Sequence, residues 1–479
     1  MRKKSVAKNY IYNLMYQILM LILPLITTPY ISRVLGAENI GIYSYTLSIS
    51  AYFVLFGSLG ISLYGQREIA YNQENKKKYT TVFYEIVILR FITMAISMTI
   101  FYFLFVNGKQ YQTYYKILLL ELIANSLDIS WFFQGLEEFK KTITRNMIVK
   151  IISIICIFLF VKSSNDLIKY FVIYVLSVLL GNISLWAYLP KYIEKIDFRK
   201  INIIKHIKPT IGLFIPQVAV QVYTVLDKTM IGVIVSDKSE VGFYEQAQKI
   251  IKILLTIVTA LGTVMVPRMA NTFIKGDKEQ LNSYMKKSFS FMYLLAFPII
   301  FGVLTVSDEF VPIFFGQGYD KVSLLMKIIS PILLMIGMSN VIGTQYLLPT
   351  KRQKEYTISV VLGAIVNFFM NLCLIGKLGA LGASIGTVIA ETMVTAVQMH
   401  YIKNDFDINR IINISVNYLV AAIIMFVTCE FVGFIVADGI KSLIIKVLLG
   451  MIVYFVTLLL LKDEFVNELK NKVLEKINQ

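Results

Sequence analysis

The chain starts with a basic segment and continues with a long apolar stretch, NYIYNLMYQILMLILPLITTPYISRV at positions 9–34. A transmembrane helix needs about 20 predominantly apolar residues, so this stretch is long enough to cross a bilayer. A secretory signal peptide has a shorter apolar region that ends at a small-residue cleavage site. Here the apolar stretch runs on to Leu35, contains Pro24 and Pro29, and has no A-x-A site. We therefore predict a retained first membrane helix.

Thirteen further apolar runs of similar length follow. The fourteen predicted spans are approximately 9–34, 40–63, 80–106, 115–136, 146–162, 167–189, 210–235, 242–266, 288–307, 322–348, 356–376, 379–402, 411–435 and 440–461. The connections are short, which leaves no room for an ATPase, sugar-nucleotide or large extracellular domain. The sequence predicts an all-α integral membrane protein with about 14 transmembrane helices.

Composition agrees with this fold class. Of the 479 residues, 57% are hydrophobic and only 16% are charged, whereas soluble domains are roughly a quarter charged. Cys156, Cys373 and Cys429 lie in separate apolar runs, and His206 and His400 lie far apart. This pattern predicts neither a disulfide framework nor a metal site, and we expect no metal and no bound cofactor.

The net charge of +17 is explained by orientation. With the N-terminus in the cytoplasm, the inside segments carry 32 Lys and Arg residues and the outside connections carry nine. Such an asymmetry is the positive-inside signal of a membrane protein. It places both termini in the cytoplasm and excludes nucleic acid as the reason for the basic charge.

The longest inside loop, between Pro190 and Pro209, separates six spans from eight. We predict an N-terminal six-helix lobe at 1–200, a second six-helix lobe at 201–405, and two extra helices with a cytoplasmic tail at 406–479. The tail has apolar residues at helical spacing, which predicts an amphipathic surface helix; a frayed charged tail is the alternative. The spaced residues are Val466, Leu469, Val473 and Ile477.

An internal repeat relates the two lobes. A shift of 201 residues superposes Ile40–Tyr43 on Val241–Tyr244 and Arg67 on Arg268. Repeats of the same direction relate two bundles about an axis along the membrane normal. We therefore predict two pseudo-symmetric bundles that enclose a substrate cavity.

Charges within apolar spans are costly, so they normally face a cavity or a partner. Arg33 follows the double-proline stretch, and Asp227 with Lys228 lies mid-span at the repeat-related position; we take these three as substrate-binding candidates. Arg33 could instead reach the outer headgroups, and Asp227 and Lys228 could join helices structurally. Glu245 and Lys249, four residues apart, form a candidate structural charge pair.

The remaining candidate site residues lie at the ends of other predicted spans or within them. Arg67 and Arg268 are candidates for contact with an anionic headgroup, although both could serve orientation alone. Asp128 and Glu391 join Asp227 as candidates for ion coupling. Glu391 follows the small-residue stretch at 379–384, which close helix packing explains by itself.

Several of these segments resemble one family. The matching segments are LPLITTPYISRVLGAENIGIYSY, GISLYGQREIA, DKTMIGVIVSDKSEVGFYEQAQKI, TVMVPRMAN and GALGASIGTVIAE. They resemble the polysaccharide repeat-unit (O-antigen and capsule, Wzx-type) flippases of the multidrug/oligosaccharidyl-lipid/polysaccharide (MOP) exporter superfamily. The resemblance implies a MATE-like fold of two six-helix bundles plus two C-terminal helices around a cationic cavity.

The resemblance also implies a function. The protein is expected to move undecaprenyl-pyrophosphate-linked oligosaccharide from the inner to the outer leaflet of the bacterial plasma membrane by alternating access. Arg33, Arg67, Asp227, Lys228 and Arg268 lie on the matching segments and are the substrate-binding candidates. Expected partners are the lipid-linked substrate, membrane lipids, and the polymerase and glycosyltransferases of the same pathway.

The expected driving force is the membrane potential. Moving a negative charge outward from an inside-negative cell is downhill by about 2.3 kcal/mol per charge per 100 mV. Arginine suits a pyrophosphate because its planar fork binds phosphate and stays charged. Whether an H⁺ or Na⁺ gradient is also coupled is left open at Asp128, Asp227 and Glu391.

Two other functions are compatible with the sequence. One is a cation-coupled multidrug exporter of the same superfamily. The other is a membrane-embedded polysaccharide polymerase, for which an outer loop at 307–321 offers the carboxylates Asp308, Glu309 and Asp320. Because the outer loops are short, we expect no enzyme activity.

Overall fold

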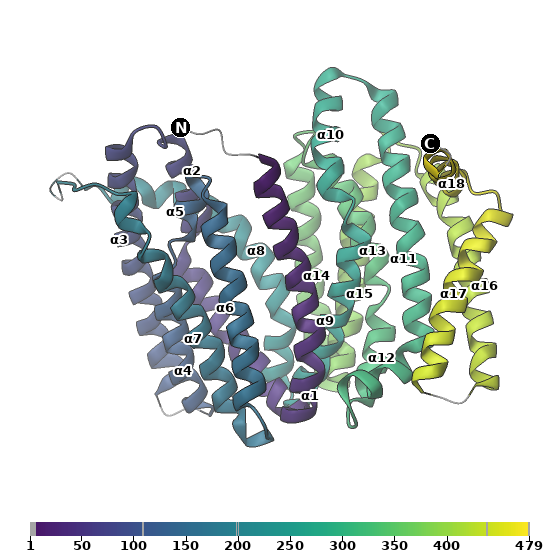
Figure 1. The fold of residues 1–479 in the computed structure, drawn as a ribbon, viewed down its shortest axis with the longest axis horizontal. Helices are drawn as coiled ribbons and strands as arrows, with labels where there is room; N and C mark the ends of the chain where they lie inside the picture. The colour runs from purple at the N-terminus through teal and green to yellow at the C-terminus, as the bar shows by residue number, and fades with distance from the viewer. Residues whose placement is uncertain (1–5, 108–109, 198, 200, 437–438, 478–479) are drawn as a thin grey trace. The chain divides into compact units, whose positions relative to one another are not determined.

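The computed structural model describes residues 6–107, 110–197, 199, 201–436 and 439–477, and these residues form helices joined by short turns, without a β-strand (Figure 1). The α-helices are α1 (Val6–Ser58), α2 (Ile61–Tyr71), α3 (Lys76–Phe101), α4 (Gln112–Ser126), α5 (Ser130–Gly135), α6 (Phe139–Phe160), α7 (Leu167–Trp186), α8 (Ile204–Ile234), α9 (Ser239–Thr259), α10 (Gly262–Lys275), α11 (Lys278–Phe315), α12 (Asp320–Ile329), α13 (Ile332–Ser339), α14 (Gln353–Leu378), α15 (Ala380–Ile402), α16 (Ile408–Ile435), α17 (Ile440–Leu460) and α18 (Glu464–Ile477). The predicted all-α membrane fold is confirmed.

Twelve segments of the described chain are long and apolar enough to span a membrane. The first, Leu21–Tyr71, covers two predicted spans, because α1 turns at Gly36, where φ is +77°. That left-handed conformation is open to glycine without a steric cost. Helix α8 matches the seventh predicted span and is not among the twelve. The number fourteen therefore stays a prediction.

The chain forms two compact units. The first contains residues 1–232 and 237–241, and the second contains 233–236 and 242–479. Most of α8 thus packs within the first unit, although the sequence assigns it to the second lobe. One contact that joins α8 to the first unit is the hydrogen bond that Thr229 donates to Ser48 on α1 (2.9 Å). The predicted boundaries at 200 and 405, and the symmetry between lobes, stay predictions.

The first unit has an aromatic core at one end of its bundle. Phe83 of α3 packs edge-on against Phe132 of α5 and stacks on Trp131, and all three side chains are fully buried. Gly65 of α2 allows this, because a Cβ there would lie 2.4 Å from the Trp131 ring. The core therefore joins α2, α3 and α5.

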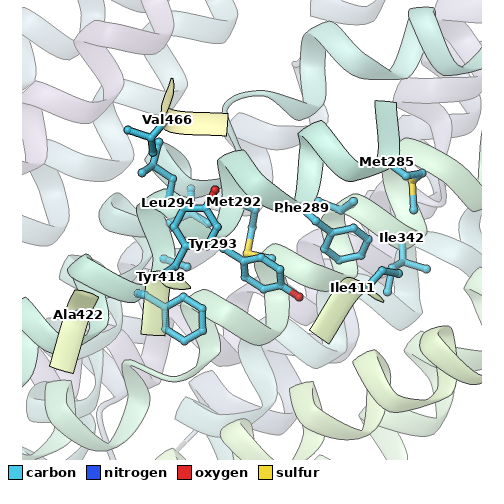
Figure 2. Packing of buried hydrophobic residues seen from close by; sticks show 14 of the residues in the cluster. Met285, Phe289, Met292, Tyr293, Leu294, Ile342, Ile411, Tyr418, Ala422 and Val466 are labelled. Carbon is cyan, nitrogen blue, oxygen red and sulfur yellow. The ribbon is translucent and has the colours of Figure 1, made fainter. Parts of the chain in front are cut away.

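The second unit is centred on α11, whose Phe289, Met292 and Tyr293 face residues of α16 (Figure 2). Tyr293 lies 6.3 Å from Tyr418, ring centre to ring centre. Helix α17 joins this core through Tyr454, which donates a hydrogen bond to the carbonyl of Leu294 (3.2 Å).

The predicted C-terminal helix forms as α18. Its Val466 is buried in the core of the second unit (Figure 2). Asp463 caps its start by accepting from the backbone N–H of Phe465 and Val466. Its Glu464 binds Lys286 of α11, and that hydrogen bond holds the pKa of the Glu464 carboxyl below its ordinary value.

The predicted outer loop at 307–321 is wrong for its first half. Helix α11 continues to Phe315, so Asp308 and Glu309 are helical residues. Pro298 and Pro312 lie within this helix, as prolines often do in membrane helices.

Close packing explains the small residues before Glu391. A Cβ on Gly382 of α15 would lie 2.6 Å from the backbone carbonyl of Leu374 on α14. Backbone atoms cannot move aside as a flexible side chain can, so Gly382→Ala should force α14 and α15 apart.

We predict that Gly382→Ala lowers the free energy of unfolding by about 1–3 kcal/mol, the usual cost of overpacking. The measurement is thermal unfolding of the purified protein in detergent. Gly302→Ala is the matched control, because a Cβ there meets nothing within 4 Å. An equal response of both variants would contradict the prediction.

Candidate functional site

The predicted basic candidates of the first unit are spread along α1 and α2. Arg33 is exposed and lies three residues before the turn at Gly36. Arg67 lies on α2 beyond Gly60, with its guanidinium 5.4 Å from the centre of the Tyr64 ring. The helix between them spans about 22 residues, or about 33 Å at 1.5 Å per residue. The two arginines therefore mark opposite ends of one membrane helix.

Asp227 and Lys228 lie between these ends. Asp227 is buried and Lys228 is half-buried. The next residue, Thr229, donates to Ser48, and the Tyr52 hydroxyl is 3.2 Å from it. Asp227 and Lys228 therefore lie beside the middle of the second half of α1. This position is compatible with substrate binding in a cavity and with a structural role between helices.

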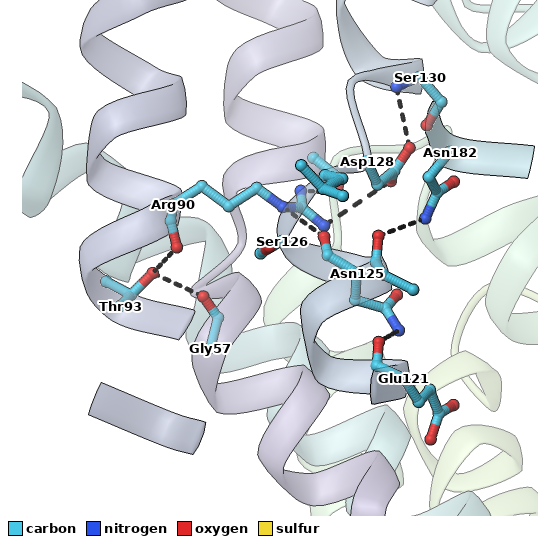
Figure 3. A network of polar contacts seen from close by, with 12 residues as sticks. Gly57, Arg90, Thr93, Glu121, Asn125, Ser126, Asp128, Ser130 and Asn182 are labelled. Carbon is cyan, nitrogen blue, oxygen red and sulfur yellow. Dashed lines mark hydrogen bonds and ion pairs between the residues drawn. The ribbon is translucent and has the colours of Figure 1, made fainter. Parts of the chain in front are cut away.

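Asp128 is paired with an arginine. The Nη2 atom of Arg90 is 3.7 Å from Oδ2 of Asp128, and its Nε donates to the carbonyl of Asn125 (2.9 Å; Figure 3). Asp128 also accepts from the backbone N–H of Ser130, which fixes the start of α5. The Arg90 side chain is only 2% exposed. This ion pair joins α3 to the turn after α4.

Glu85, five residues from Arg90 on α3, has different partners, as its position on the helix predicts. Its Oε2 is 2.8 Å from Nε2 of His206, and its Oε1 accepts from Lys205 (2.9 Å) and from the backbone N–H of Asn202 (2.8 Å). On the other side of the imidazole, Nδ1 lies 2.7 Å from the hydroxyl of Tyr64. This network fixes the start of α8 to α2 and α3. His206 therefore links Tyr64 of α2 to Glu85 of α3.

Glu121 is a third buried carboxylate in the first unit. It accepts hydrogen bonds from Ser50 (2.7 Å) and Tyr174 (2.8 Å), which come from α1 and α7. Nearby, Asn182 of α7 donates to the carbonyl of Ala124 and accepts from Arg145 of α6. Four helices are joined by these contacts.

The second unit holds the other predicted residues. Arg268 is exposed on α10, and Glu391 is buried on α15. Glu245 and Lys249 lie one turn apart on α9, and both are half-buried. Their roles in substrate binding, ion coupling and charge pairing stay predictions.

A buried ion pair in the second unit is absent from the predicted sites. Glu309 of α11 binds the ammonium of Lys446 on α17 and accepts from Ser442 (3.0 Å). Both charged residues are 7% exposed. Lys446 lies within the last apolar run, six residues after its start, and a charge within an apolar run was the signal available in the sequence. The sequence did not identify Glu309 as the partner of Lys446, because Glu309 was predicted to lie in an outer loop.

The described residues contain no group of His, Cys, Asp and Glu suited to a metal ion. Asp308 and Glu309, two carboxylates of the predicted loop, have different partners. Asp308 binds Ser323 and Lys327, whereas Glu309 faces Lys446.

A family model described as "Polysaccharide biosynthesis protein" matches residues 6–273, more than half of the chain. The chain belongs to this family. It is also 25% identical over 410 residues to a protein of Escherichia coli (strain K12) named "Putative O-antigen transporter", covering 84% of this chain and 98% of that protein.

Two solved structures share the fold. One is the lipid II flippase MurJ in an inward closed conformation, with a TM-score of 0.73 and 17% identity over 94% of this chain and 98% of that one. The other is an inward-facing multidrug resistance transporter of the MATE family in the MOP superfamily. It has a TM-score of 0.62 and 12% identity over 82% of this chain and 94% of that one. The predicted MATE-like membrane fold is confirmed for this family member.

Because Glu85 is fully buried and has three partners, its removal leaves His206 and the start of α8 without an acceptor. We predict that Glu85→Ala lowers the stability of the protein by about 3–5 kcal/mol, the cost of breaking a buried charge network. Lys205→Ala should cost much less, since Lys205 is half exposed. Thermal unfolding in detergent measures both. Similar losses in the two variants would argue against a buried network.

The Glu309–Lys446 pair gives a second stability prediction. Glu309→Gln should destabilise the protein, because the Lys446 ammonium then stays buried without its counter-charge. The double variant Glu309→Gln, Lys446→Met should recover part of the loss. Asp320→Asn serves as the control, because Asp320 is exposed. No recovery in the double variant would contradict the pairing.

Proposed function

We propose that this polysaccharide biosynthesis family member is a lipid-linked oligosaccharide flippase. It moves undecaprenyl-pyrophosphate-linked repeat units from the inner to the outer leaflet of the bacterial plasma membrane. The observation that carries the proposal is the nearly full-length similarity to an O-antigen transporter, on a fold shared with a lipid II flippase.

The distribution of charge supports this function. A pyrophosphate-linked glycan cannot cross hydrocarbon unaided, because its polar groups would lose their hydrogen bonds. Arg33 and Arg67 stand at opposite ends of one helix, with Lys228 beside its middle. An anionic head can therefore meet a basic group at each depth of the first unit.

In this proposal the lipid chain stays in the bilayer while the head passes through the protein. The membrane potential drives the outward movement of the anionic head. Asp128, which is bound to Arg90, Asp227 and Glu391 are the proposed candidates for any coupled H⁺ or Na⁺. Both termini lie in the cytoplasm, and the polymerase and glycosyltransferases of the pathway are the proposed partners.

A cation-coupled drug exporter is the second candidate, because a multidrug transporter has the same fold. The two functions differ in what cells lose when the gene is deleted. Loss of surface polysaccharide with intracellular accumulation of lipid-linked units supports the flippase. Loss of dye efflux with normal polysaccharide supports the exporter.

We predict that Arg33→Ala or Lys228→Ala, expressed at normal levels in the deletion strain, abolishes polysaccharide export. Arg33→Lys should restore part of it, because lysine keeps the charge but loses the bidentate phosphate contact. Surface polysaccharide, quantified against protein abundance in the membrane, is the measurement. Full export by the double alanine variant would refute a cationic path.

A further inference from the structure

A cavity of about 500 Å³ lies in the second unit, between the start of α11 and the start of α16. Small-molecule sites typically measure about 300–1,000 Å³. The lining of this cavity is amphipathic. Its apolar part includes the buried residues Met285, Phe289 and Ile411, which are labelled in Figure 2. Its charged part is mostly exposed and consists of Glu279, Lys286, Asp405, Asp407 and Arg410.

The cavity lies at a predicted boundary of the membrane. Its charged residues precede the predicted spans at 288–307 and 411–435, whereas Phe289 and Ile411 lie at the start of those spans. The C-terminal helix α18 is attached here, because its Glu464 binds Lys286. Amphipathic helices of this kind lie at the boundary between headgroups and acyl chains. We therefore expect the cavity to face phospholipid headgroups.

Three of the five charged groups in the lining have a partner in the fold. Arg352 binds Asp405, and Glu464 binds Lys286. Asp407 caps the start of α16 by accepting a hydrogen bond from a backbone N–H (3.2 Å). The positive end of the helix dipole also stabilises a carboxylate at that position. These three charges are accounted for without a ligand.

The other two charges are Glu279 and Arg410. Among the described residues, neither side chain forms a hydrogen bond or an ion pair, whether with the other or with a third residue. Lys286 chiefly lowers the pKa of the Glu464 carboxyl, and the charge of Arg410 contributes to this from a longer distance. The described lining thus offers one unpaired cation and one unpaired anion in the same cavity.

This combination of charges indicates the kind of headgroup. A phosphate suits Arg410, because a guanidinium can bind two phosphate oxygens at once and stays charged. A purely anionic headgroup would also meet the negative charge of Glu279. A headgroup that carries a primary ammonium group as well gives Glu279 a cation with three N–H donors. A choline headgroup has the same charges but no N–H donor, so phosphoethanolamine matches the lining best.

We propose that this cavity binds the headgroup of phosphatidylethanolamine, with Arg410 on the phosphate and Glu279 on the ammonium group. The apolar lining of Met285, Phe289 and Ile411 packs against the glycerol esters and the first methylene groups of the chains. The inference goes beyond the proposed flippase function and does not depend on it. It gives the second unit a specific lipid site beside α18.

The test is native mass spectrometry of the delipidated full-length protein in detergent. The probes are the dioleoyl forms of phosphatidylethanolamine, phosphatidylcholine and phosphatidylglycerol, and the dissociation constant of the first bound lipid is measured. We expect phosphatidylethanolamine to bind about tenfold more tightly than the other two, which corresponds to about 1.4 kcal/mol. Equal binding of the three lipids would overturn the inference, and is the result expected if a segment of a partner protein occupies the cavity.

Two substitutions separate the two contacts. Glu279→Gln should remove the preference for phosphatidylethanolamine over phosphatidylcholine, because the amide has no charge to attract the ammonium group. Arg410→Ala should weaken the binding of both lipids about tenfold, because both carry the phosphate. Both residues are exposed, and thermal unfolding in detergent verifies that the variants fold like the parent protein. A preference that persists in Glu279→Gln, or binding that Arg410→Ala leaves unchanged, would overturn the assignment.

Two neighbouring substitutions are the controls. Lys278→Ala changes the residue before Glu279, and Asn409→Ala changes the residue before Arg410; both are exposed and neither lines the cavity. Both variants should bind lipid like the parent protein, and a loss equal to that of the neighbouring variant would contradict the site. Soluble glycerophosphoethanolamine, which lacks the chains, should not displace the lipid at equal concentration. Displacement would assign the cavity to a soluble compound and overturn the lipid assignment.

The outcome is separable from the proposed function. If the deletion strain still exports polysaccharide, the flippase proposal fails and the lipid measurement is unaffected. If the three lipids bind equally while the deletion abolishes export, the phosphatidylethanolamine site is refuted and the flippase proposal stands.

Discussion

An ionised side chain within a bilayer has no water to solvate it, and that constraint organises both units of this protein. Arg90 reaches Asp128 from a different helix, and Glu309 binds Lys446 in the same manner. Glu85 is satisfied by a lysine, a histidine and a backbone N–H at once. Each contact joins segments from different parts of the bundle. Apolar packing alone would not fix the register between helices, because an apolar side chain packs about as well against lipid as against another helix.

The same constraint separates structural charges from functional ones. A charge that has a close partner of opposite sign is accounted for by the fold. Arg33, Arg67 and Arg268 are exposed, so an external anion can reach their guanidinium groups, although Arg67 also lies 3.6 Å from Glu68. A transporter of an anionic lipid head needs such groups at several depths, because a single tight site would hold its cargo rather than pass it on.

The apolar runs could be predicted because hydrocarbon tolerates little else over about 20 residues. Helical periodicity explains why Glu85 and Arg90 do not pair, since residues five apart point to different sides of one helix. The prediction of membrane spans from apolar runs failed where a helix contains charged residues. Residues 307–315 were interpreted as a loop because of Asp308 and Glu309, yet they are helical, since partners on α12 and α17 neutralise both carboxylates.

By itself, the sequence determined that the chain has many membrane-spanning segments and which of its segments resemble a polysaccharide flippase, and it predicted the orientation of the basic segments. Those properties depend on composition and short motifs along the chain. Only the tertiary structure decided which charge meets which, because partners such as Glu85 and His206 are 121 residues apart. It also placed Lys150 of α6 in the lining of a cavity that α1 and α7 complete. A cavity is made by the packing of three helices, and no single segment contains it.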